Sequence, residues 1–286
     1  MEKVGQSRKI RGYTALLLIM SVIFLAACKS VMYKVPPVAA SSNQVVVWHD
    51  LLSPDALRSR QFMEGVLGWK TKTGNTYSTL YGRRGQVVGG IFDTQAMDWN
   101  LRAGGWLLSM STSDLDATLK KILDKGGRLL QPAQDIPDRG HSALVADPQG
   151  AVFNLVELSP SQESGESVDS DTWIWYELIT AQPAVAAAWY ANVFQLEVVD
   201  LDGGRKLLKK DGVDIATVSV NSFEDSRNQW LAVVAVNDFE NTVVNVSREG
   251  GRVALVLPSP AGNGKLALVQ DPTGAALILQ EQEVSP

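Results

Sequence analysis

The chain has very little of the residue types that form cross-links, metal clusters or basic surfaces. One Cys among 286 residues allows no internal disulfide bond, and two His cannot form a His-rich metal cluster. The 26 Lys and Arg stand against 31 Asp and Glu, for a net charge of -5, which argues against nucleic acid as a partner. With 45% hydrophobic and 20% charged residues, the composition excludes a disordered or multispanning chain.

The N-terminus has the pattern of an export signal. Four basic residues lie within residues 1–12, an uncharged run of 13 residues follows from Ala15 to Ala27, and the only Cys, Cys28, comes directly after Leu-Ala-Ala. This run is shorter than the roughly 20 residues that cross a bilayer as a helix. A basic segment, a short apolar core and small residues before a cleavage point are typical of a cleaved signal peptide.

This segment resembles a bacterial lipoprotein signal. The resemblance implies a signal peptide at 1–27, acylation of Cys28, and a bilayer anchor in the cell envelope. Lys29 is not the Asp associated with inner-membrane retention, so the resemblance implies an outer-membrane anchor facing the periplasm. Cleavage would leave 22 basic against 30 acidic residues, a charge of -8, so the lipid rather than headgroup charge would hold the protein. An ordinary secretory signal with a free Cys is the alternative.

The remainder of the chain is a tandem duplication. Residues 28–44 lack periodicity and are predicted to be a tether. After them, landmarks recur in one order at offsets of 124 to 127 residues, as expected of a repeat. These landmarks are Trp48-His49-Asp50-Leu51 with Trp175-Tyr176-Glu177-Leu178, Trp106-Leu107 with Trp230-Leu231, Gly126-Gly127-Arg128 with Gly250-Gly251-Arg252, and Asp147-Pro148-Gln149-Gly150-Ala151 with Asp271-Pro272-Thr273-Gly274-Ala275.

Each copy has the pattern strand, helix and three strands, twice over. Polar, acidic residues 159–171 are predicted to link domain 1 at 45–158 to domain 2 at 172–282. In the first module, Ser53 is expected to cap a helix with Pro54 at its first position, and Gly68 to end it. We therefore predict an α+β fold of four βαβββ modules, which pair either within each copy or across the duplication.

The ordered landmarks resemble the vicinal oxygen chelate superfamily of glyoxalases, extradiol dioxygenases and bleomycin-resistance proteins. The resemblance covers nearly all of residues 45–282. The motifs that carry it are Trp48 to Leu51, Phe62 through Gly68-Trp69, Gly126-Gly127, and the two Asp-Pro-x-Gly-Ala turns with the apolar strands that follow. It implies tandem glyoxalase-like domains whose curved sheets enclose cavities. In catalytic members, it implies a divalent metal held there by His and Glu.

Transferring the metal positions implied by this resemblance to the chain yields no set of metal ligands. The positions fall on Trp48 and Trp175, near Gly90, on Trp106 or Leu107, on Trp230 or Leu231, and on Asn154 and Ile278. Only Asn154 offers an oxygen, whereas a catalytic site of this type needs about three protein ligands. We therefore expect no cofactor, and a divalent metal enters only under an alternative hypothesis.

The two His do not change this expectation. His49 follows a metal position by one residue, so strand alternation points it away from the face of Trp48 and Asp50. A one-residue bulge could turn it into the cavity, which makes His49 the one metal candidate. His141 lies in a turn and is expected to face solvent.

A Trp and an acidic residue share one strand face in each copy. Trp48 lies two residues before Asp50, and Trp175 lies two residues before Glu177. A ring beside a carboxylate suits a flat, polar or cationic organic ligand. Alternatively, the rings are core and the acids are solvated strand ends. The predicted ligand-binding residues are Trp48, Asp50, Trp106, Asn154, Trp175, Glu177 and Trp230.

Three functional hypotheses remain. The first is an envelope-anchored, metal-free protein that binds or sequesters a small organic molecule, as bleomycin-resistance proteins do. The second is a metal-dependent lyase or dioxygenase using His49, Asp50 and Glu157, although strand parity places Asp50 and Glu157 on different faces. The third is a non-catalytic envelope scaffold with filled cavities. No serine or cysteine nucleophile motif is visible, and the ligand is not identified.

Overall fold

The computed structural model describes residues 45–99, 101–136, 139–158, 172–222, 227–259 and 264–282. The predicted signal peptide, tether and linker lie outside these ranges, so they and the domain boundaries stay predictions. None of the helices within the described ranges is long and apolar enough to cross a membrane.

The first copy forms one mixed sheet of eight strands, in the order β2-β3-β4-β1-β5-β8-β7-β6. Its first module contains β1 (Val46–Ser53), α1 (Ala56–Leu67), β2 (Lys70–Thr73), β3 (Tyr77–Tyr81) and β4 (Val87–Asp93). Its second module contains β5 (Gly105–Ser111), α2 (Leu115–Asp124), β6 (Arg128–Ile136), β7 (Gly140–Ala146) and β8 (Val152–Glu157).

The second copy repeats this topology in a second eight-stranded sheet, in the order β10-β11-β12-β9-β13-β16-β15-β14. Its first module contains β9 (Trp173–Thr180), α3 (Pro183–Phe194), β10 (Glu197–Asp200), the 3-10 helix η1 (Asp202–Gly204), β11 (Lys206–Lys210) and β12 (Val213–Val220). Its second module contains β13 (Gln229–Val236), α4 (Phe239–Arg248), β14 (Arg252–Pro258), β15 (Lys265–Gln270) and β16 (Ala276–Glu281). The predicted α+β fold of four βαβββ modules is confirmed.

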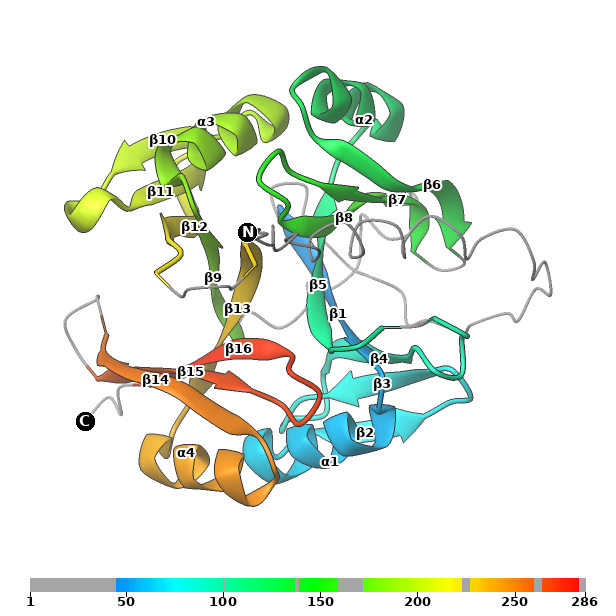
Figure 1. Cartoon of the computed structure of the whole chain (residues 1–286), viewed down its shortest axis with the longest axis vertical. Helices are drawn as coiled ribbons and strands as arrows, with labels where there is room; N and C mark the ends of the chain where they lie inside the picture. The colour runs from blue at the N-terminus through cyan, green and yellow to red at the C-terminus, as the bar shows by residue number, and fades with distance from the viewer. Residues whose placement is uncertain are drawn as a thin grey trace, which may run out of the picture. The chain divides into compact units, whose positions relative to one another are not determined.

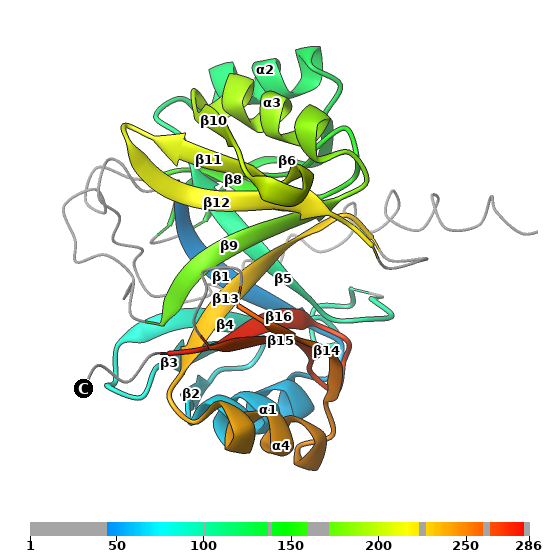
Figure 2. The same cartoon turned by 90° about the vertical axis from the view of Figure 1, so that its left-hand side faces the viewer.

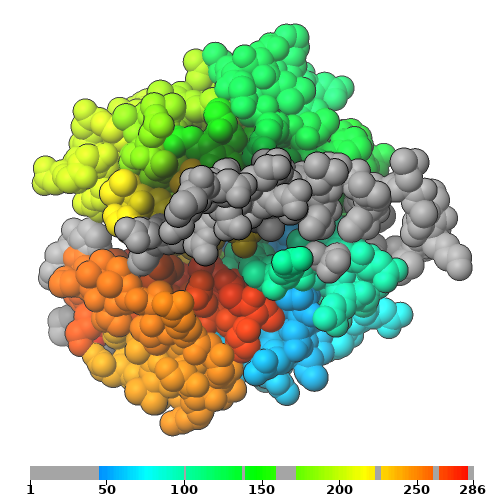
Figure 3. All heavy atoms as spheres, in the orientation of Figure 1, coloured from blue at the N-terminus to red at the C-terminus, as the bar shows by residue number. Residues whose placement is uncertain are grey.

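The modules pair within each copy through their strands and across the copies through their helices. Strand β1 pairs antiparallel with β5, and β9 with β13. Helix α1 packs on α4, and α2 packs on α3, so each helix pair joins the two copies (Figure 2). In the space-filling view, α1 and α4 meet at one end of the described part of the chain, and α2 and α3 at the other (Figure 3).

The two sheets are curved and lie back to back, with β1 and β5 of the first beside β9 and β13 of the second (Figure 1). We call the face of each sheet that is turned toward the other copy its back face, and the opposite face its front face. Alternation along each strand assigns successive side chains to these two faces. The front faces carry Trp48 and Asp50 in the first copy and Trp175 and Glu177 in the second.

The helix expected to begin at Pro54 begins two residues later, at Ala56. Asp55 is the N-cap, because its side chain accepts a hydrogen bond from the Arg58 backbone N–H at 3.1 Å. The Ser53 hydroxyl is instead hydrogen-bonded to the Ser59 hydroxyl at 2.8 Å. The predicted stop is confirmed, since Gly68 adopts a left-handed conformation with φ of 65°.

The two Asp-Pro-x-Gly-Ala turns also connect the copies. In each turn, one oxygen of the Asp accepts two backbone N–H groups of the turn itself. The other oxygen of Asp147 accepts the Tyr190 hydroxyl from α3 at 3.2 Å. The other oxygen of Asp271 accepts the Ser59 hydroxyl from α1 at 2.5 Å. The repeated motif is therefore both a local turn and a bond between copies.

Candidate functional site: two front faces

Four side chains close the front face of the first copy: Trp48, Asp50, Tyr77 and Arg139, called here the Arg139 cluster. Arg139 lies just before β7 and donates to both oxygens of Asp50, one of them at 3.1 Å, and to the Tyr77 hydroxyl at 2.7 Å. The Trp48 indole N–H and the Tyr77 hydroxyl donate to Asp50 at 3.0 and 3.1 Å. Both oxygens of the Asp50 carboxylate therefore accept hydrogen bonds from other side chains of the protein.

The Arg139 cluster is almost completely buried. Asp50 is 2% exposed and Arg139 is 3% exposed, and the guanidinium carbon lies 4.6 Å from the centre of the Trp48 ring. Burial alone would lower the pKa of Arg139, but the Asp50 carboxylate beside it leaves that pKa raised above its usual value. Burial also raises the pKa of Tyr77. The cluster is thus a charged pair with a neutral phenol, shielded from solvent.

The Tyr77 ring fills the space where a side chain at Gly90 would lie. Gly90 pairs with Asp50 across β4 and β1, which places both on the front face. A Cβ atom at Gly90 would overlap the Tyr77 hydroxyl and ring. The Tyr77 ring thus occupies the volume where a metal-binding side chain on β4 would lie.

The equivalent position of the second copy is arranged differently. We call Trp175, Glu177, Thr217 and Ser219 the Glu177 site. The Trp175 indole N–H donates to the Thr217 hydroxyl at 2.9 Å, and that hydroxyl donates to Glu177. Ser219 also donates to the Glu177 carboxylate. Trp175 and Glu177 both remain partly exposed, in contrast to Trp48 and Asp50.

The Glu177 carboxylate carries a desolvation cost. Burial raises its pKa, while hydrogen bonds from Ser219 and Thr217 and the charge of Arg205 act in the opposite direction without cancelling the effect. A carboxylate in this state gains from a further hydrogen-bond donor or a cation. Asp50, by contrast, is fully paired with Arg139.

An apolar patch lies on the same face as the Glu177 site. Leu231 on β13 is directly opposite Glu177, so the two side chains share the front face. Leu231 packs in a cluster with Ile179, Ala276, Leu268 and Ile278. Leu231 is 1% exposed, so only the partly buried Leu268 and Ile278 of this cluster reach the surface. Polar groups on β9 and β12 thus lie on the same sheet face as a small apolar patch formed by Leu268 on β15 and Ile278 on β16.

Trp106 and Trp230, which were also predicted to bind a ligand, lie on the back faces and so do not share a face with Trp48 and Trp175. Their ligand-binding role stays a prediction. The Trp106 ring packs against Trp173 of the other copy, with centroids 5.2 Å apart. The Trp230 indole N–H donates to the Tyr190 hydroxyl on α3 at 2.9 Å. The adjacent Leu107 and Leu231 lie on the front faces instead, because a shift of one residue along a strand reverses the face.

Asn154 lies on the front face of the first copy. It is aligned with Ser109, which in turn is opposite Trp48. The Asn154 side-chain N–H donates to the Ser109 hydroxyl at 3.2 Å. Ile278, its counterpart, is part of the apolar patch of the second copy.

His49 lies on the back face, as strand alternation predicts. It stacks on Trp173 with ring centroids 4.2 Å apart, and its Nε2 atom is hydrogen-bonded to the Tyr176 hydroxyl at 3.1 Å. Burial lowers the pKa of His49 to about 3, so the ring is neutral at physiological pH. The β1 register shift lies before Trp48 and does not turn His49 forward. His141 is partly exposed and pairs with Asp135 at 2.8 Å.

Comparisons with known proteins agree with this fold. No protein-family profile matches the chain. The putative glyoxylase CFP32 of Mycobacterium bovis is 26% identical over 238 residues, which cover 80% of this chain and 91% of that protein. The anthracycline biosynthesis protein DauV of a Streptomyces species is 26% identical over 255 residues, covering 82% and 92%.

Solved structures with the same fold include a glyoxalase and a dioxygenase. The Mn(II)-bound glyoxalase from Novosphingobium aromaticivorans matches with a TM-score of 0.59 and 12% identity, over 85% of this chain and 83% of its own. Homoprotocatechuate 2,3-dioxygenase from Arthrobacter globiformis matches with a TM-score of 0.56 and 14% identity, over 86% and 82%. The chain therefore has the fold of these glyoxalase and dioxygenase structures, the fold that the resemblance to the vicinal oxygen chelate superfamily implies.

The residues of this chain do not fit a metal at the positions that the resemblance implies. In the first copy these positions hold Trp48, Gly90, Leu107 and Asn154, and in the second Trp175, Thr217, Leu231 and Ile278. A neutral amide and one hydroxyl are poor donors for a transition metal. Within the described ranges, no group of three His, Cys, Asp or Glu side chains could hold an ion. The absence of a cofactor stays a prediction.

The alternative metal set of His49, Asp50 and Glu157 is not brought together. His49 is on the back face, Asp50 is paired with Arg139, and the Glu157 carboxylate accepts the Leu115 backbone N–H at 2.7 Å. Glu157 therefore caps the start of α2.

Sequence reasoning missed Arg139, Tyr77, Thr217 and Ser219. Arg139 is 89 residues from Asp50 along the chain, so no local pattern links them. Thr217 could be found only once its alignment with Glu177, the counterpart of the Gly90 pairing, was known.

Proposed function

We propose that this protein is a non-catalytic binding protein that holds a small organic molecule at the Glu177 site. The observation that supports this most directly is the partly exposed Glu177 carboxylate beside the Trp175 ring, next to an apolar patch. Ligand sites in proteins typically combine an apolar wall with a few positioned polar groups. The equivalent carboxylate of the first copy, Asp50, is already paired with Arg139. We therefore assign ligand binding to the second copy.

The chemistry of the site favours a flat, cationic ligand. The Trp175 ring is held by its bond to Thr217, which reduces the entropy lost when a ligand stacks on it. A protonated amine or amidine would complete the hydrogen bonding of Glu177 and remove its desolvation cost. The hydrocarbon part of such a ligand would lie on the partly exposed Leu268 and Ile278.

Calorimetric titration of the mature chain with a panel of aromatic amines and amidines tests this proposal. Trp175→Ala and Glu177→Gln should each weaken binding of the selected ligand by about tenfold or more, the loss expected for a stacked or charge-assisted contact. Glu197→Gln, at an exposed position on β10, and the conservative Trp48→Phe serve as controls. Unchanged affinities in both Glu177-site variants would exclude the proposal.

A metal-dependent lyase or dioxygenase is the competing function, and it needs donors that the superfamily positions lack. Elemental analysis of the protein purified without chelators separates the two. Stoichiometric Mn, Fe, Ni or Zn retained through dialysis would overturn the metal-free proposal.

For the first copy, the closed Arg139 cluster favours the scaffold hypothesis, because side chains fill its front face.

We also propose that the protein is anchored through acylated Cys28 to the periplasmic side of the outer membrane. The support is the basic segment, the apolar run and the position of the only Cys. Cys28→Ala should move the protein from the membrane to the soluble fraction. Lys29→Asp should keep it in a membrane but redirect it to the inner one. A Cys28→Ala protein that stays with membranes would contradict the proposal.

A further inference from the structure

A row of apolar side chains crosses the front face of the second copy, beginning at Trp175. Val233 on β13 is aligned with Trp175 on one side and with Ile278 on the other. Leu268 is aligned with Ile278, and Leu255 on the edge strand β14 is aligned with Leu268. Aligned residues of neighbouring strands lie on the same face of a sheet. The Trp175 row therefore consists of Trp175, Val233, Ile278, Leu268 and Leu255.

The Trp175 row is long and partly open to solvent. Its strands follow one another in the order β9-β13-β16-β15-β14 (Figure 1), and neighbouring strands lie about 4.8 Å apart, so the row measures roughly 19 Å along the curved sheet. All of its members except the buried Val233 are partly exposed. Leu257, which is 44% exposed, is aligned with Leu266 and extends the apolar surface along β14 and β15. The row can therefore accept an extended hydrocarbon chain lying across the strands.

The fold does not require an apolar row at this place, because the first copy has polar side chains there. The aligned residues of the first copy, in the same order, are Trp48, Ser109, Asn154, Leu144 and Gln131. Three of these five are polar, and the Asn154 side chain donates to the Ser109 hydroxyl. A solvated sheet face favours polar residues, so the aliphatic side chains of the second copy indicate contact with an apolar group.

The row adjoins the Glu177 site at Trp175. Glu177 lies two residues after Trp175 on β9, so both side chains are on the front face, and no member of the row is charged. A ring stacked on Trp175 would thus have Glu177 at one side and Val233 and Ile278 at the other. The strip is also narrow: at roughly 200 Å² it is far below the 800 Å² or so that each partner of a stable protein interface buries. It suits the chain of a small ligand better than a protein.

We propose that the ligand of the Glu177 site carries an alkyl chain that lies along the Trp175 row. This inference rests on the function proposed above for that site, and it narrows the ligand from a flat cation to a flat cation with a hydrocarbon tail. The tail covers aliphatic side chains that otherwise face water, which favours binding. Because β14 is an edge strand, the row is open at that end.

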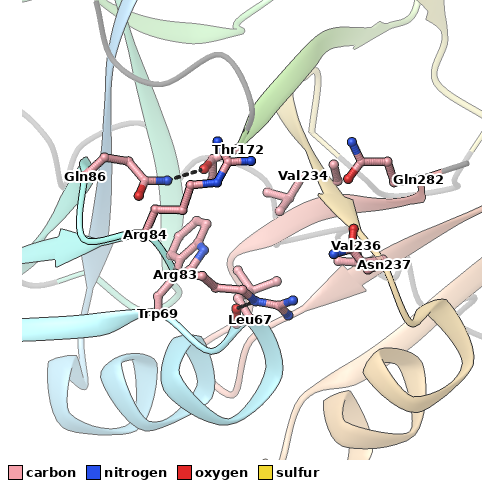
Figure 4. Close-up of a pocket in the computed structure, with 11 residues that line it drawn as sticks. Leu67, Trp69, Arg83, Arg84, Gln86, Thr172, Val234, Val236, Asn237 and Gln282 are labelled. Carbon is pink, nitrogen blue, oxygen red and sulfur yellow. Dashed lines mark hydrogen bonds between the residues drawn. The ribbon is translucent and has the colours of Figure 1, made fainter. Parts of the chain in front are cut away.

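The pocket between the two copies is a separate place. Its volume is about 120 Å³, and its lining includes Trp69 and Gln86 of the first copy and Thr172 and Asn237 of the second (Figure 4). No member of the Trp175 row lines it. Gln86→Leu removes the 3.1 Å hydrogen bond from Gln86 to Thr172 and so serves as a control for binding in this pocket.

Calorimetric titration with a series of benzamidines tests the proposal. The probes are benzamidine and its 4-butyl, 4-heptyl and 4-decyl derivatives, kept below the concentrations at which they form micelles. The mature chain carries Cys28→Ala and is prepared without detergent, since a detergent chain would compete for the row. A fully buried CH₂ group strengthens binding about fourfold, so a chain that buries about half its surface should gain about twofold per CH₂. Binding of benzamidine with no gain from the chain would overturn this inference and leave the proposed function intact.

Variants that give the second copy the side chains of the first test the row itself. Ile278→Asn and Leu255→Gln should each reduce the gain per CH₂, and Leu255→Gln should act only on the longer chains because it is farther from Trp175. Val256→Gln is the matched control, since Val256 is the next residue on β14, is 45% exposed and faces the other side of the sheet. If circular dichroism shows that Ile278→Asn does not fold, Leu255→Gln at the sheet edge still decides. Equal effects of Val256→Gln and Leu255→Gln, or weakening by Gln86→Leu alone, would overturn the proposal.

Two further measurements separate the alternatives. The neutral 4-decylbenzamide should bind more weakly than 4-decylbenzamidine. Equal affinity of the two, with a loss in the row variants, would contradict the charged contact at Glu177 and support the row. Sedimentation of the ligand-free protein tests a second copy as the occupant. A dimer that Leu255→Gln dissociates would show that another copy covers the row and would overturn the assignment of an alkyl chain.

Discussion

In the first copy, Asp50 is 2% exposed and paired with Arg139, whereas in the second copy Glu177 is partly exposed and bonded to two hydroxyls. Both acids lie on the first strand of their copy, two residues after a Trp. The hydrogen-bond partners of each carboxylate therefore come from other elements of the fold, and they set how exposed that carboxylate is. A guanidinium brought by a distant turn makes it part of the structure, and hydroxyls on the adjacent strand leave it able to receive a ligand.

One residue on the neighbouring strand accounts for much of this difference. The β4 residue aligned with Asp50 is Gly90, which admits the Tyr77 ring over the sheet. The β12 residue aligned with Glu177 is Thr217, whose hydroxyl links Trp175 to the carboxylate. The two copies thus share one strand order and differ in how they fill one position.

The largest difference between the copies is expected when each carboxylate is converted to its amide. Asp50→Asn leaves the Arg139 charge buried without its counter-charge and should cost about 3–5 kcal/mol of unfolding free energy. Glu177→Gln should change that free energy by less than about 1 kcal/mol, because the side chain is partly exposed. Urea unfolding followed by circular dichroism measures both.

A double variant controls for the buried charge. Asp50→Asn combined with Arg139→Met removes both charges and should recover a large part of the loss. Similar destabilisation by Asp50→Asn and Glu177→Gln would show that the two front faces do not differ as described.

A smaller effect is expected from adding one methyl group at the aligned position. Gly90→Ala places a Cβ atom where the Tyr77 ring lies and should cost about 1–3 kcal/mol through overpacking. Thermal unfolding would show the loss as a lower Tm. In a Tyr77→Leu background, the same substitution should cost less, since the ring is gone. A Gly90→Ala protein with the wild-type Tm would contradict the steric role of Tyr77.

The smallest effect is the pH dependence of stability at the Glu177 site. The pKa of Glu177 is raised in the folded state above the ordinary value of 4.5, so the fold favours the protonated form. The unfolding free energy of wild type minus that of Glu177→Gln should therefore be slightly lower at a pH above the raised pKa than at low pH. As the pH falls through the raised pKa and below 4.5, this penalty should disappear. Urea unfolding of both proteins across this pH range measures the difference.

Local patterns in the sequence were sufficient for the fold and for the direction of several side chains. The repeated Asp-Pro-x-Gly-Ala turns and the strand and helix patterns predicted four modules, which the two sheets confirm. Alternation correctly placed His49 behind the sheet and Trp48 in front of it. The sequence left one position open between Trp106 and Leu107, and between Trp230 and Leu231, and a shift of one residue reverses the face.

Turns, caps and strand alternation are interactions among residues a few positions apart, so the sequence by itself determined the module pattern and the shared face of each Trp and acid. Only the tertiary structure decided that Arg139 closes the first front face, that Ser59 binds Asp271 from 212 residues away, and that side chains of five strands line up in the Trp175 row. These contacts depend on how the curved sheets and their turns pack, and packing is a property of the whole chain rather than of any short segment.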